Sequence, residues 1–558
     1  MDFQKIILWI AIAAVSVMLM NEWQAFKEEK TAVVNSTQTA AMPSKAAPNI
    51  VSNNGDLPQM IQPGSDAVDV STSVSQLNLI TVETDLLRVV IDTEGGDIVE
   101  VDLLKHKDNV NNPDSVLRLL QNDQVRTYIA QSGLIGPNGT DTNEGRPTFV
   151  ADESSYALGN DDELNVDMSF RNDAGVLITK RYTFRRDSYV IDQTYLINNM
   201  SEAPWQAALF GQIKRDSSKD PSASDSGMGM RSFLGIAATT DEERYKKLPF
   251  DDIAEEPFKA MVQGGWIAMS QHYFLSAWIP NQNSTNNFGA LVSKSGLNIA
   301  RFTMPMIEVA PGQQGQTKAS LYVGPKDQYR LEKVAENLDL TVDYGWLWWI
   351  AQPLFWIMIM IHKFIPNWGL TIILLTIFVK SLFFKLSAAS YESMANMRRV
   401  TPKLNDIKER YADDKQKQSQ MMMELYKKEK INPMGGCLPI FIQMPVFISL
   451  YWVLMESVEI RHAPFFAWIQ DLSAMDPYYI LPLIMGVSMF AQQKLSPQAF
   501  TDPMQQKIMQ YMPVMFTFFF LWFPSGLVLY WVVNNVLSIA QQYVITKRIE
   551  AKYGTASK

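Results

Sequence analysis

The stretch NPMGGCLPIFIQMPVFISLYWVLM, residues 432–455, decides the fold class. From Cys437 to its end it contains no charged residue, and a helix needs about 20 apolar residues to cross the hydrocarbon of a bilayer. Three more apolar stretches occur in the same part of the chain, at 368–386, 478–492 and 512–543. The C-terminal part is therefore predicted to be a membrane α-helical bundle.

The charged residues are divided unevenly between two parts of the chain. Residues 21–345 contain 28 Lys and Arg against 44 Asp and Glu, a net charge of -16. All other residues together contain 21 basic and 14 acidic side chains, a net charge of +7. This asymmetry predicts a water-facing domain joined to a membrane domain with cationic loops.

The N-terminus carries an uncharged apolar run at 6–20, with Trp9 near its start and Trp23 shortly after its end. A cleaved signal peptide is one interpretation of so short a run. The absence of a clear cleavage site and the interfacial position of both tryptophans favour an uncleaved transmembrane anchor over 1–24. The following residues, 25–76, are rich in Ala, Ser, Thr, Asn, Gln and Pro, which predicts a flexible linker.

Residues 77–340 show short alternating runs, such as GVLITKRY at 175–182, separated by Asn, Asp and Gly. This pattern predicts a large all-β sandwich domain, closed by a helix over 327–338. Residues 341–364 begin with Trp346, Trp348 and Trp349 and are interrupted by Pro353. They are predicted to form an interfacial amphipathic helix, and a full span is the alternative.

Loop charges predict the orientation of the core, residues 365–548. Segment 385–430 contains 11 basic and 7 acidic residues, whereas 456–477 contains one arginine and four acidic residues. Basic loops stay in the cytoplasm, so both termini are predicted to lie inside and the β domain outside. With the anchor, five spans are predicted, four of them in the core. The core spans are about 366–386, 436–456, 477–494 and 511–543, with a cytoplasmic helical hairpin at 390–431 and a tail at 549–558.

Lys380 is a charge inside a predicted span, five residues deeper than Lys385. A lysine at the bilayer centre costs about 2.5–3.5 kcal/mol. Either it reaches back to the cytoplasmic surface, as suits Lys385, or it faces a polar, water-filled groove inside the bundle. Thr376 lies one turn away on the same face, which favours the groove.

Two further patterns each allow two interpretations. Trp531, Asn534, Ser538 and Gln541 share one face of the last span, and such a polar stripe either lines a groove or holds helices together by hydrogen bonds. In the hairpin, Met394, Met397, Met421 and Met422 form either an ordinary core or an adaptable surface for many apolar segments.

The sequence contains no nucleotide-binding motif, no H-E-x-x-H and no CxxC pair. We therefore predict no enzyme activity, no cofactor and no metal. His106 and His272 could serve a sugar-type site in the β domain, so a membrane-anchored periplasmic sugar-modifying enzyme is one alternative. A polytopic solute or ion transporter is another, although a transporter would favour paired titratable groups within its spans.

Several motifs resemble the YidC/Oxa/Alb membrane-insertase family, densely over about 345–548. They are Asn432–Pro439, Gln443–Phe447, Arg461–Phe465, Asp502–Lys507 and Phe523–Leu527. The anchor and outer domain resemble the Gram-negative form of this family, whose outer domain is a periplasmic β-supersandwich.

The resemblance implies a bacterial inner-membrane protein that inserts and folds other membrane proteins, alone or with the Sec translocon. Its expected partners are nascent membrane proteins, the translocon and its accessory subunits, the ribosome at the cytoplasmic face and membrane lipids, without recognition of nucleic acid sequence. It also implies a hydrophilic groove, open to cytoplasm and lipid, that holds one cation. Lys380 occupies that place, where bacterial relatives usually carry Arg. The compact ammonium charge of lysine thus replaces the several N–H donors of a planar guanidinium.

The expected site residues follow from the same resemblance. The groove is expected to be lined by Lys380, Thr376, Trp531, Asn534 and Gln443. The path that client helices follow, the substrate slide, is expected to include Met444, Phe447, Leu450 and Leu527. The hairpin is expected to be needed for activity.

Overall fold

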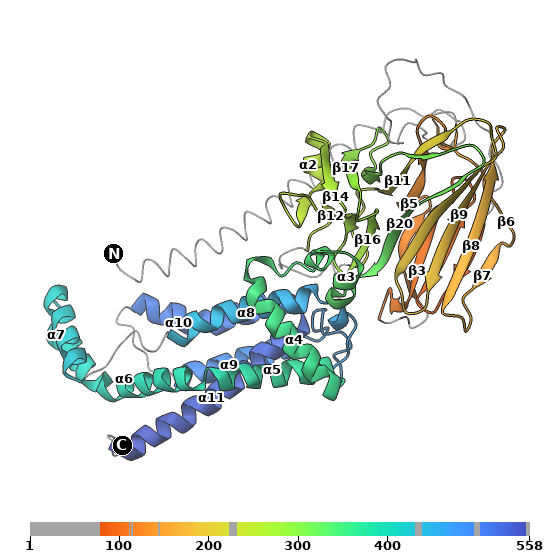
Figure 1. The fold of residues 1–558 in the computed structure, drawn as a ribbon. Helices are drawn as coiled ribbons and strands as arrows, with labels where there is room; N and C mark the ends of the chain where they lie inside the picture. The colour runs from red at the N-terminus through yellow and green to blue at the C-terminus, as the bar shows by residue number, and fades with distance from the viewer. Residues whose placement is uncertain are drawn as a thin grey trace, which may run out of the picture. The chain divides into compact units, whose positions relative to one another are not determined.

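The structure is a computed structural model that describes residues 79–110, 112, 115–142, 145–222, 232–429, 438–495 and 503–553 (Figure 1). All of these residues belong to one compact unit. The predicted anchor, the predicted linker and the motif at 432–437 with Cys437 lie outside the described residues.

The first sheet of the β domain has eleven strands in the order β14-β17-β18-β11-β5-β4-β3-β2-β1-β7, with β19 paired to β11. All of its pairings are antiparallel except β1 with β7. The strands are β1 Leu79–Glu83, β2 Leu87–Asp92, β3 Asp97–Lys107, β4 Val116–Asn122, β5 Thr127–Ile135, β7 Ser155–Ala157, β11 Trp205–Arg215, β14 Phe258–Gln263, β17 Thr285–Val292, β18 Asn298–Thr303 and β19 Ile307–Val309.

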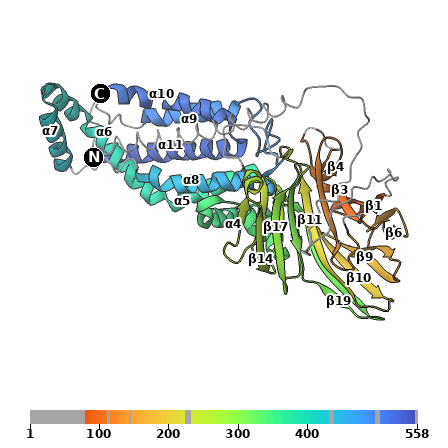
Figure 2. The same ribbon diagram turned by 90° about the horizontal axis from the view of Figure 1, so that it is seen from above.

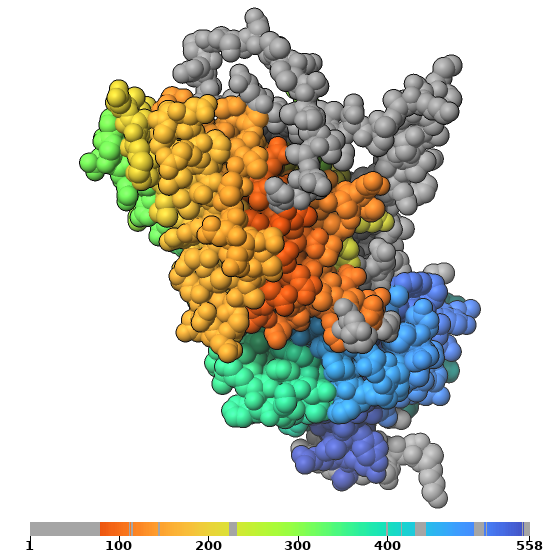
Figure 3. All heavy atoms as spheres, turned by 90° about the vertical axis from the view of Figure 1, so that its right-hand side faces the viewer, coloured from red at the N-terminus to blue at the C-terminus, as the bar shows by residue number. Residues whose placement is uncertain are grey.

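The second sheet has nine strands in the order β13-β12-β15-β16-β20-β10-β9-β8-β6. They are β6 Val150–Ala151, β8 Glu163–Arg171, β9 Val176–Arg185, β10 Val190–Asn199, β12 Gly235–Ala238, β13 Lys246–Leu248, β15 Ile267–Ser270, β16 Phe274–Ile279 and β20 Gln314–Pro325. Alternate residues of β10 are buried, because successive side chains of a strand point to opposite faces. The predicted all-β sandwich is confirmed, and Figure 3 shows the surface of its red to yellow strands.

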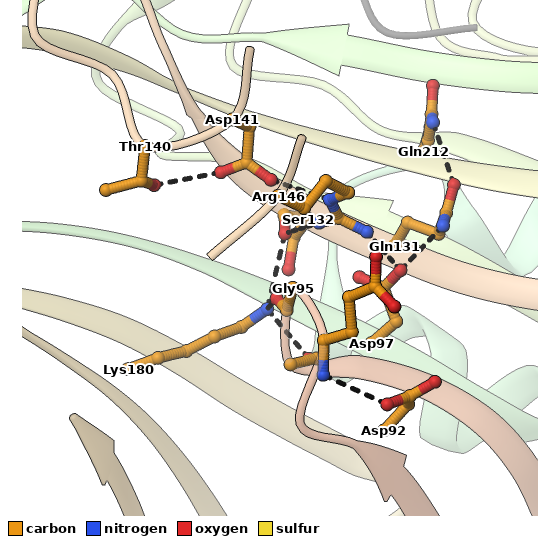
Figure 4. Close-up of polar contacts among 12 residues, drawn as sticks. Asp92, Gly95, Asp97, Gln131, Ser132, Thr140, Asp141, Arg146, Lys180 and Gln212 are labelled. Atoms are coloured by element: carbon orange, nitrogen blue, oxygen red, sulfur yellow. Dashed lines mark hydrogen bonds and ion pairs between the residues drawn. The ribbon is translucent and has the colours of Figure 1, made fainter. Parts of the chain in front are cut away.

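A buried charged cluster joins the two sheets (Figure 4). Lys180 of β9 donates hydrogen bonds to the carbonyl oxygens of Gly95 and Gly96, at 2.9 and 2.8 Å, and to that of Ser132 on β5 at 3.3 Å. Beside it, the Arg146 guanidinium pairs with two buried aspartates, Asp97 and Asp141. Buried charges are tolerated only when paired and hydrogen-bonded, so this cluster holds the sheets in one relative position.

Both glycines of the β2–β3 turn have positive φ, 73° and 64°. A Cβ at Gly95 would meet Arg146, and one at Gly96 would meet Lys180. The turn therefore needs glycine twice, because a side chain would enter the space that the two cations occupy.

Helix α2, Phe250–Glu255, lies within the β domain between β13 and β14. Three short helices connect the β domain to the helices that follow: α3 Gln328–Val334, η2 Leu338–Thr341 and η3 Gly345–Leu347. Asp327 caps α3 by accepting from the backbone N–H groups of Tyr329 and Arg330, as is typical of helix N-termini.

Eight longer helices follow: α4 Trp348–Phe364, α5 Trp368–Leu382, α6 Phe384–Arg410, α7 Lys415–Lys428, α8 Leu438–Glu456, α9 Ile480–Leu495, α10 Pro503–Phe519 and α11 Ser525–Tyr553. Two short turns, η4 Val458–Ile460 and η5 Phe520–Trp522, lie between them. In this bundle α11 packs against α5, α6 and α9, and α4 packs against α8 and α5 (Figure 2). The predicted hairpin turn is confirmed, because α6 ends at Arg410 and α7 begins at Lys415.

The predicted single span over 511–543 is wrong, because the structure divides it between α10 and α11. The helix breaks at η5 and Pro524, which has no N–H to continue the hydrogen-bond ladder. Ser525 instead donates its backbone N–H to the carbonyl of Ala474 at 2.7 Å.

By length and hydropathy, one helix of the described chain could cross a membrane unaided, Gly345–Phe364. It is the segment predicted to be interfacial, for which a full span was the alternative. Helix α5 and the first part of α6 meet the same criteria only as a pair bent by 68°, and the apolar helices Ile442–Glu456 and Ile480–Leu495 are shorter. The helical region is thus established, whereas the count of five spans is not confirmed.

Candidate functional site

Lys380 lies buried between α5, α6 and α11. Its side chain is on the inner face of α5, and the residue is 8% exposed. The Nζ donates a hydrogen bond to Ser538 Oγ of α11 at 2.8 Å. Ser538 in turn donates to the carbonyl oxygen of Asn534 at 2.6 Å. The cation of α5 is therefore held by polar groups of α11.

The break between α5 and α6 creates this environment. Helix α5 ends at Leu382 and α6 leaves it at 68°. The turn is supported from α11, where Gln541 Nε2 donates to the Phe384 carbonyl at 3.1 Å. Buried Ser387 and Ser390 follow on α6. The inner side of the bend thus carries polar side chains.

The other residues predicted to line the groove are only partly gathered around Lys380. Thr376 is buried one turn away, but its hydroxyl donates to the Ile372 carbonyl of its own helix at 2.6 Å. Asn534 is half-buried and contributes its carbonyl to Ser538. Gln443 is half-buried on α8, a helix that packs against α11 and α6.

Trp531 packs in an aromatic cluster rather than among the polar groups. Its ring meets Phe447 of α8 edge-on, with centroids 4.7 Å apart at 84°. It also lies 5.3 Å from the ring of Phe520 and 6.4 Å from that of Phe516. The structure thus brings together one residue predicted for the groove and one predicted for the slide.

The remaining slide residues differ in exposure. Met444 of α8 is 42% exposed, whereas Leu450 and Leu527 are completely buried. Met444 therefore lies at the surface of the bundle, and Leu450 and Leu527 pack inside it.

Sequence reasoning missed a second buried polar contact. Asn535 of α11 donates through Nδ2 to Ser488 Oγ of α9 at 3.0 Å, and Ser488 donates to the Met485 carbonyl. Asn535 lies beside the polar stripe rather than on it. The signal that could have found it is an amide within an apolar helix, because such a group needs a partner in a neighbouring helix.

The hairpin contains a small core of its own. Met397, Val400, Leu404 and Tyr426 are buried together, and Met422 and Leu425 pack against them. Met394 and Met421 are half-buried. Two of the four predicted methionines, Met397 and Met422, therefore belong to an ordinary hairpin core. The neighbouring Met423, which was not among the four, is 52% exposed.

Both histidines of the β domain pack against or make hydrogen bonds with neighbouring groups of the fold. His106 lies against Tyr189 and Phe274, and burial lowers its pKa to about 4, with Arg461 adding to the effect. His272 contacts the Met455 carbonyl through Nε2 at 2.8 Å. A pocket of about 370 Å³ beside α3 is lined by other residues, including Tyr189, Arg330 and Lys333. Within the described ranges no group of three His, Cys, Asp or Glu could hold a metal ion.

Comparison with known proteins agrees with this division of the chain. Residues 79–357 match the family model of the YidC periplasmic domain, and residues 360–552 match that of the 60Kd inner membrane protein. The membrane protein insertase YidC of Cellvibrio japonicus (strain Ueda107) is 54% identical over 553 residues, and that of Marinomonas sp. (strain MWYL1) is 50% identical over 558. Each alignment covers 99% of this chain, with 99% of the first relative and 100% of the second.

Among solved structures, an active YidC insertase crystal structure with its first transmembrane domain resolved matches with a TM-score of 0.37 and 18% identity. The match covers 87% of this chain and 94% of that one.

These findings define the class first: an inner-membrane protein with a β-rich periplasmic domain and a C-terminal helical region. More particularly, the chain belongs to the YidC family of membrane protein insertases. It inserts membrane proteins, so nascent membrane proteins and lipids are its partners. The transporter and sugar-modifying alternatives are not favoured.

Proposed function

We propose that this insertase works through a hydrophilic groove between α5, α6 and α11, in which Lys380 is the cation that receives the client. The hydrogen bond from Lys380 Nζ to Ser538 Oγ carries the proposal. A lysine at the centre of a bilayer costs about 2.5–3.5 kcal/mol. Its retention on an inner helix face, among hydroxyl groups, supports a polar role inside the bundle rather than snorkelling to the surface.

The mechanism follows from the solvation of the client. Polar groups in the groove lower the cost of bringing a hydrophilic chain end partway into the bilayer, and Lys380 attracts acidic residues in that end. The apolar helix of the client then moves sideways into lipid, driven by burial of its surface at roughly 25 cal/mol per Å². This route needs no nucleotide, in keeping with the absence of a nucleotide-binding motif from the sequence.

The slide is proposed to run along α8 and the end of α10. Met444 is exposed there, and Phe447 and Trp531 form an aromatic contact at the inner edge. Fully buried Leu450 and Leu527 support the helices from within.

Division of 503–553 into two helices supports a topology with both termini in the cytoplasm. Five crossings would leave the termini on opposite sides, which conflicts with the loop charges. Helix α11 has 29 residues, roughly 44 Å at the rise of an α-helix, and α10 has 17. If α4 lies at the interface, and α5, α8, α9, α10 and α11 each cross the hydrocarbon, about 30 Å thick, the crossings together with the N-terminal anchor number six, which is even.

The Sec translocon and, at the cytoplasmic face, the ribosome are proposed as further partners. The hairpin α6–α7 faces the cytoplasm in this topology, and its exposed lysines suit a ribosome surface by charge alone. Sequence-specific recognition of nucleic acid is not part of the proposal.

The role of Lys380 can be tested by charge reversal. Lys380→Glu should lower insertion of a client with an acidic tail at least tenfold in proteoliposomes, and Lys380→Arg should keep most of it, because the positive potential remains. A client with a neutral tail should be affected less. Insertion is measured as the protease-protected fraction of radiolabelled client.

Lys385→Glu is the matched control, because Lys385 is an exposed lysine five residues further along the chain. It should change insertion of the acidic-tailed client less than twofold. Equal insertion of that client by the wild type and Lys380→Glu would rule out the electrostatic role.

A further inference from the structure

The C-terminal end of α8 fits into a socket formed by the β domain. We call Ser232, Gln271, His272 and Lys326 the α8 socket. Lys326 directly follows β20, and Gln271 and His272 lie between β15 and β16. The last two residues of α8, Met455 and Glu456, make hydrogen bonds or an ion pair with this socket.

Glu456 is an acidic side chain in an unfavourable place. The C-terminal end of a helix carries partial negative charge, so an acid in the last turn opposes the helix dipole. The Glu456 side chain is also almost completely buried, at 3% exposure. Without a partner such a carboxylate would be strongly destabilising.

The socket supplies the partners that Glu456 needs. Lys326 Nζ lies 3.4 Å from Glu456 Oε2, and its side chain is 1% exposed. Ser232 Oγ donates to the same carboxylate oxygen at 3.1 Å. Lys326 is itself held in place, because its Nζ donates to the Gln271 carbonyl at 3.3 Å and its backbone N–H to the Tyr273 carbonyl at 2.8 Å.

The socket also caps the helix. The last carbonyls of a helix have no partner within it. His272 Nε2 lies 2.8 Å from the Met455 carbonyl oxygen and donates to it. The backbone N–H of His272 donates to the Asp220 carboxylate at 2.8 Å, which fixes the backbone that carries the imidazole ring.

We propose that Glu456 and Lys326 are positioning residues of the insertase, through which the β domain sets the placement of α8. A buried ion pair is directional, and its best-attested use is to specify one arrangement rather than to add stability. Phe447 lies on the same helix nine residues before Glu456, so a shift of the helix end moves the contact between Phe447 and Trp531. The inference rests on insertase activity and does not depend on the proposed role of Lys380.

A charge-exchange experiment with the full chain in nanodiscs tests this. Cys437 is first replaced by Ser, because it is the one cysteine of the chain. Spin labels at Lys318 on β20 and Met444 on α8, both exposed, report the distance between the β domain and α8. Insertion is measured separately on unlabelled protein in proteoliposomes.

Glu456→Lys and Lys326→Glu should each broaden the distance distribution and lower the insertion rate at least threefold. The exchanged pair, Lys326→Glu with Glu456→Lys, should restore a narrow distribution and at least half of the insertion rate. Lys247→Glu is the control, since Lys247 pairs with Asp343 in a partly exposed position where solvent screens the interaction. It should leave both measurements unchanged.

Glu456→Gln keeps the volume and the hydrogen bond to Ser232, so it covers the case in which a reversed variant does not fold. It should lower insertion at least twofold and broaden the distance distribution. The proposal is overturned if the single variants leave the distance distribution unchanged. It is also overturned if they broaden the distribution but leave the insertion rate unchanged, or if the exchanged pair restores neither the narrow distribution nor the insertion rate. This proposal and the Lys380 mechanism can be tested separately, because Lys380→Glu should lose insertion while the distance distribution stays narrow.

Discussion

Lys380 depends on the Ser538 hydroxyl for its position. Ser538 Oγ accepts from the ammonium at 2.8 Å while it donates to the Asn534 carbonyl, so its lone pair is oriented toward Lys380. A serine hydroxyl has one donor and two acceptor sites. Here the donor and one acceptor site are used by these two contacts, which limits the freedom of the hydroxyl to turn.

Ser538→Ala should therefore let the Lys380 side chain leave the inner face. We expect insertion of an acidic-tailed client to fall about tenfold or more, because a lost hydrogen bond to a charged group is worth about 1.5–3 kcal/mol. Ser538→Thr, which keeps the hydroxyl, should retain most activity. Ser449→Ala is the control, since that buried hydroxyl serves only the Pro445 carbonyl of its own helix in the contacts described. Insertion that falls equally in Ser538→Ala and Ser449→Ala would point to general destabilisation.

At the scale of elements, α9 and α10 approach each other through a glycine. A Cβ at Gly486 would collide with Thr517 Oγ1, and that hydroxyl already donates to the Pro513 carbonyl at 2.7 Å. Small residues at helix contacts allow the backbones to come close in membranes. The packing of α10, the helix that the sequence pattern merged with α11, rests in part on this contact.

Gly486→Val should separate α9 from α10. Overpacking of this kind costs about 1–3 kcal/mol, and we expect a lower unfolding temperature in detergent, measured by the tryptophan fluorescence of the protein. Val487→Ala is the control, because Val487 is 71% exposed and adjacent in sequence. The close contact would be unimportant if both variants unfolded at the wild-type temperature.

At the scale of the whole molecule, buried histidines make stability depend on pH. The pKa of His106 is lowered to about 4 by burial and by Arg461, and burial also lowers the pKa of His272 and of His462. An unfolded histidine titrates near 6.5. Below that pH the unfolded chain binds protons that the folded protein does not, so the free energy of unfolding falls as the pH drops from 6.5 toward 4.

Urea unfolding of the nanodisc-embedded protein should accordingly show a loss of about 1 kcal/mol from His106 alone between pH 7 and pH 5.5. His106→Gln should reduce the slope of stability against pH without abolishing it, because His272 and His462 remain. The measurement is the tryptophan fluorescence midpoint at each pH. An identical slope in the wild type and His106→Gln would show that His106 is not kept neutral by the fold.

Local patterns were enough to predict the β sandwich, the apolar helices and the hairpin turn after Arg410, because periodicity and composition depend on neighbours in the sequence. The sequence by itself, through its motifs, also determined the family. Only the tertiary structure decided that Lys380 meets Ser538, 158 residues away, that Glu456 pairs with Lys326, and that 503–553 forms two helices. These features depend on which distant backbone groups come within hydrogen-bonding distance, and an apolar run looks the same in sequence whether it crosses once or turns back.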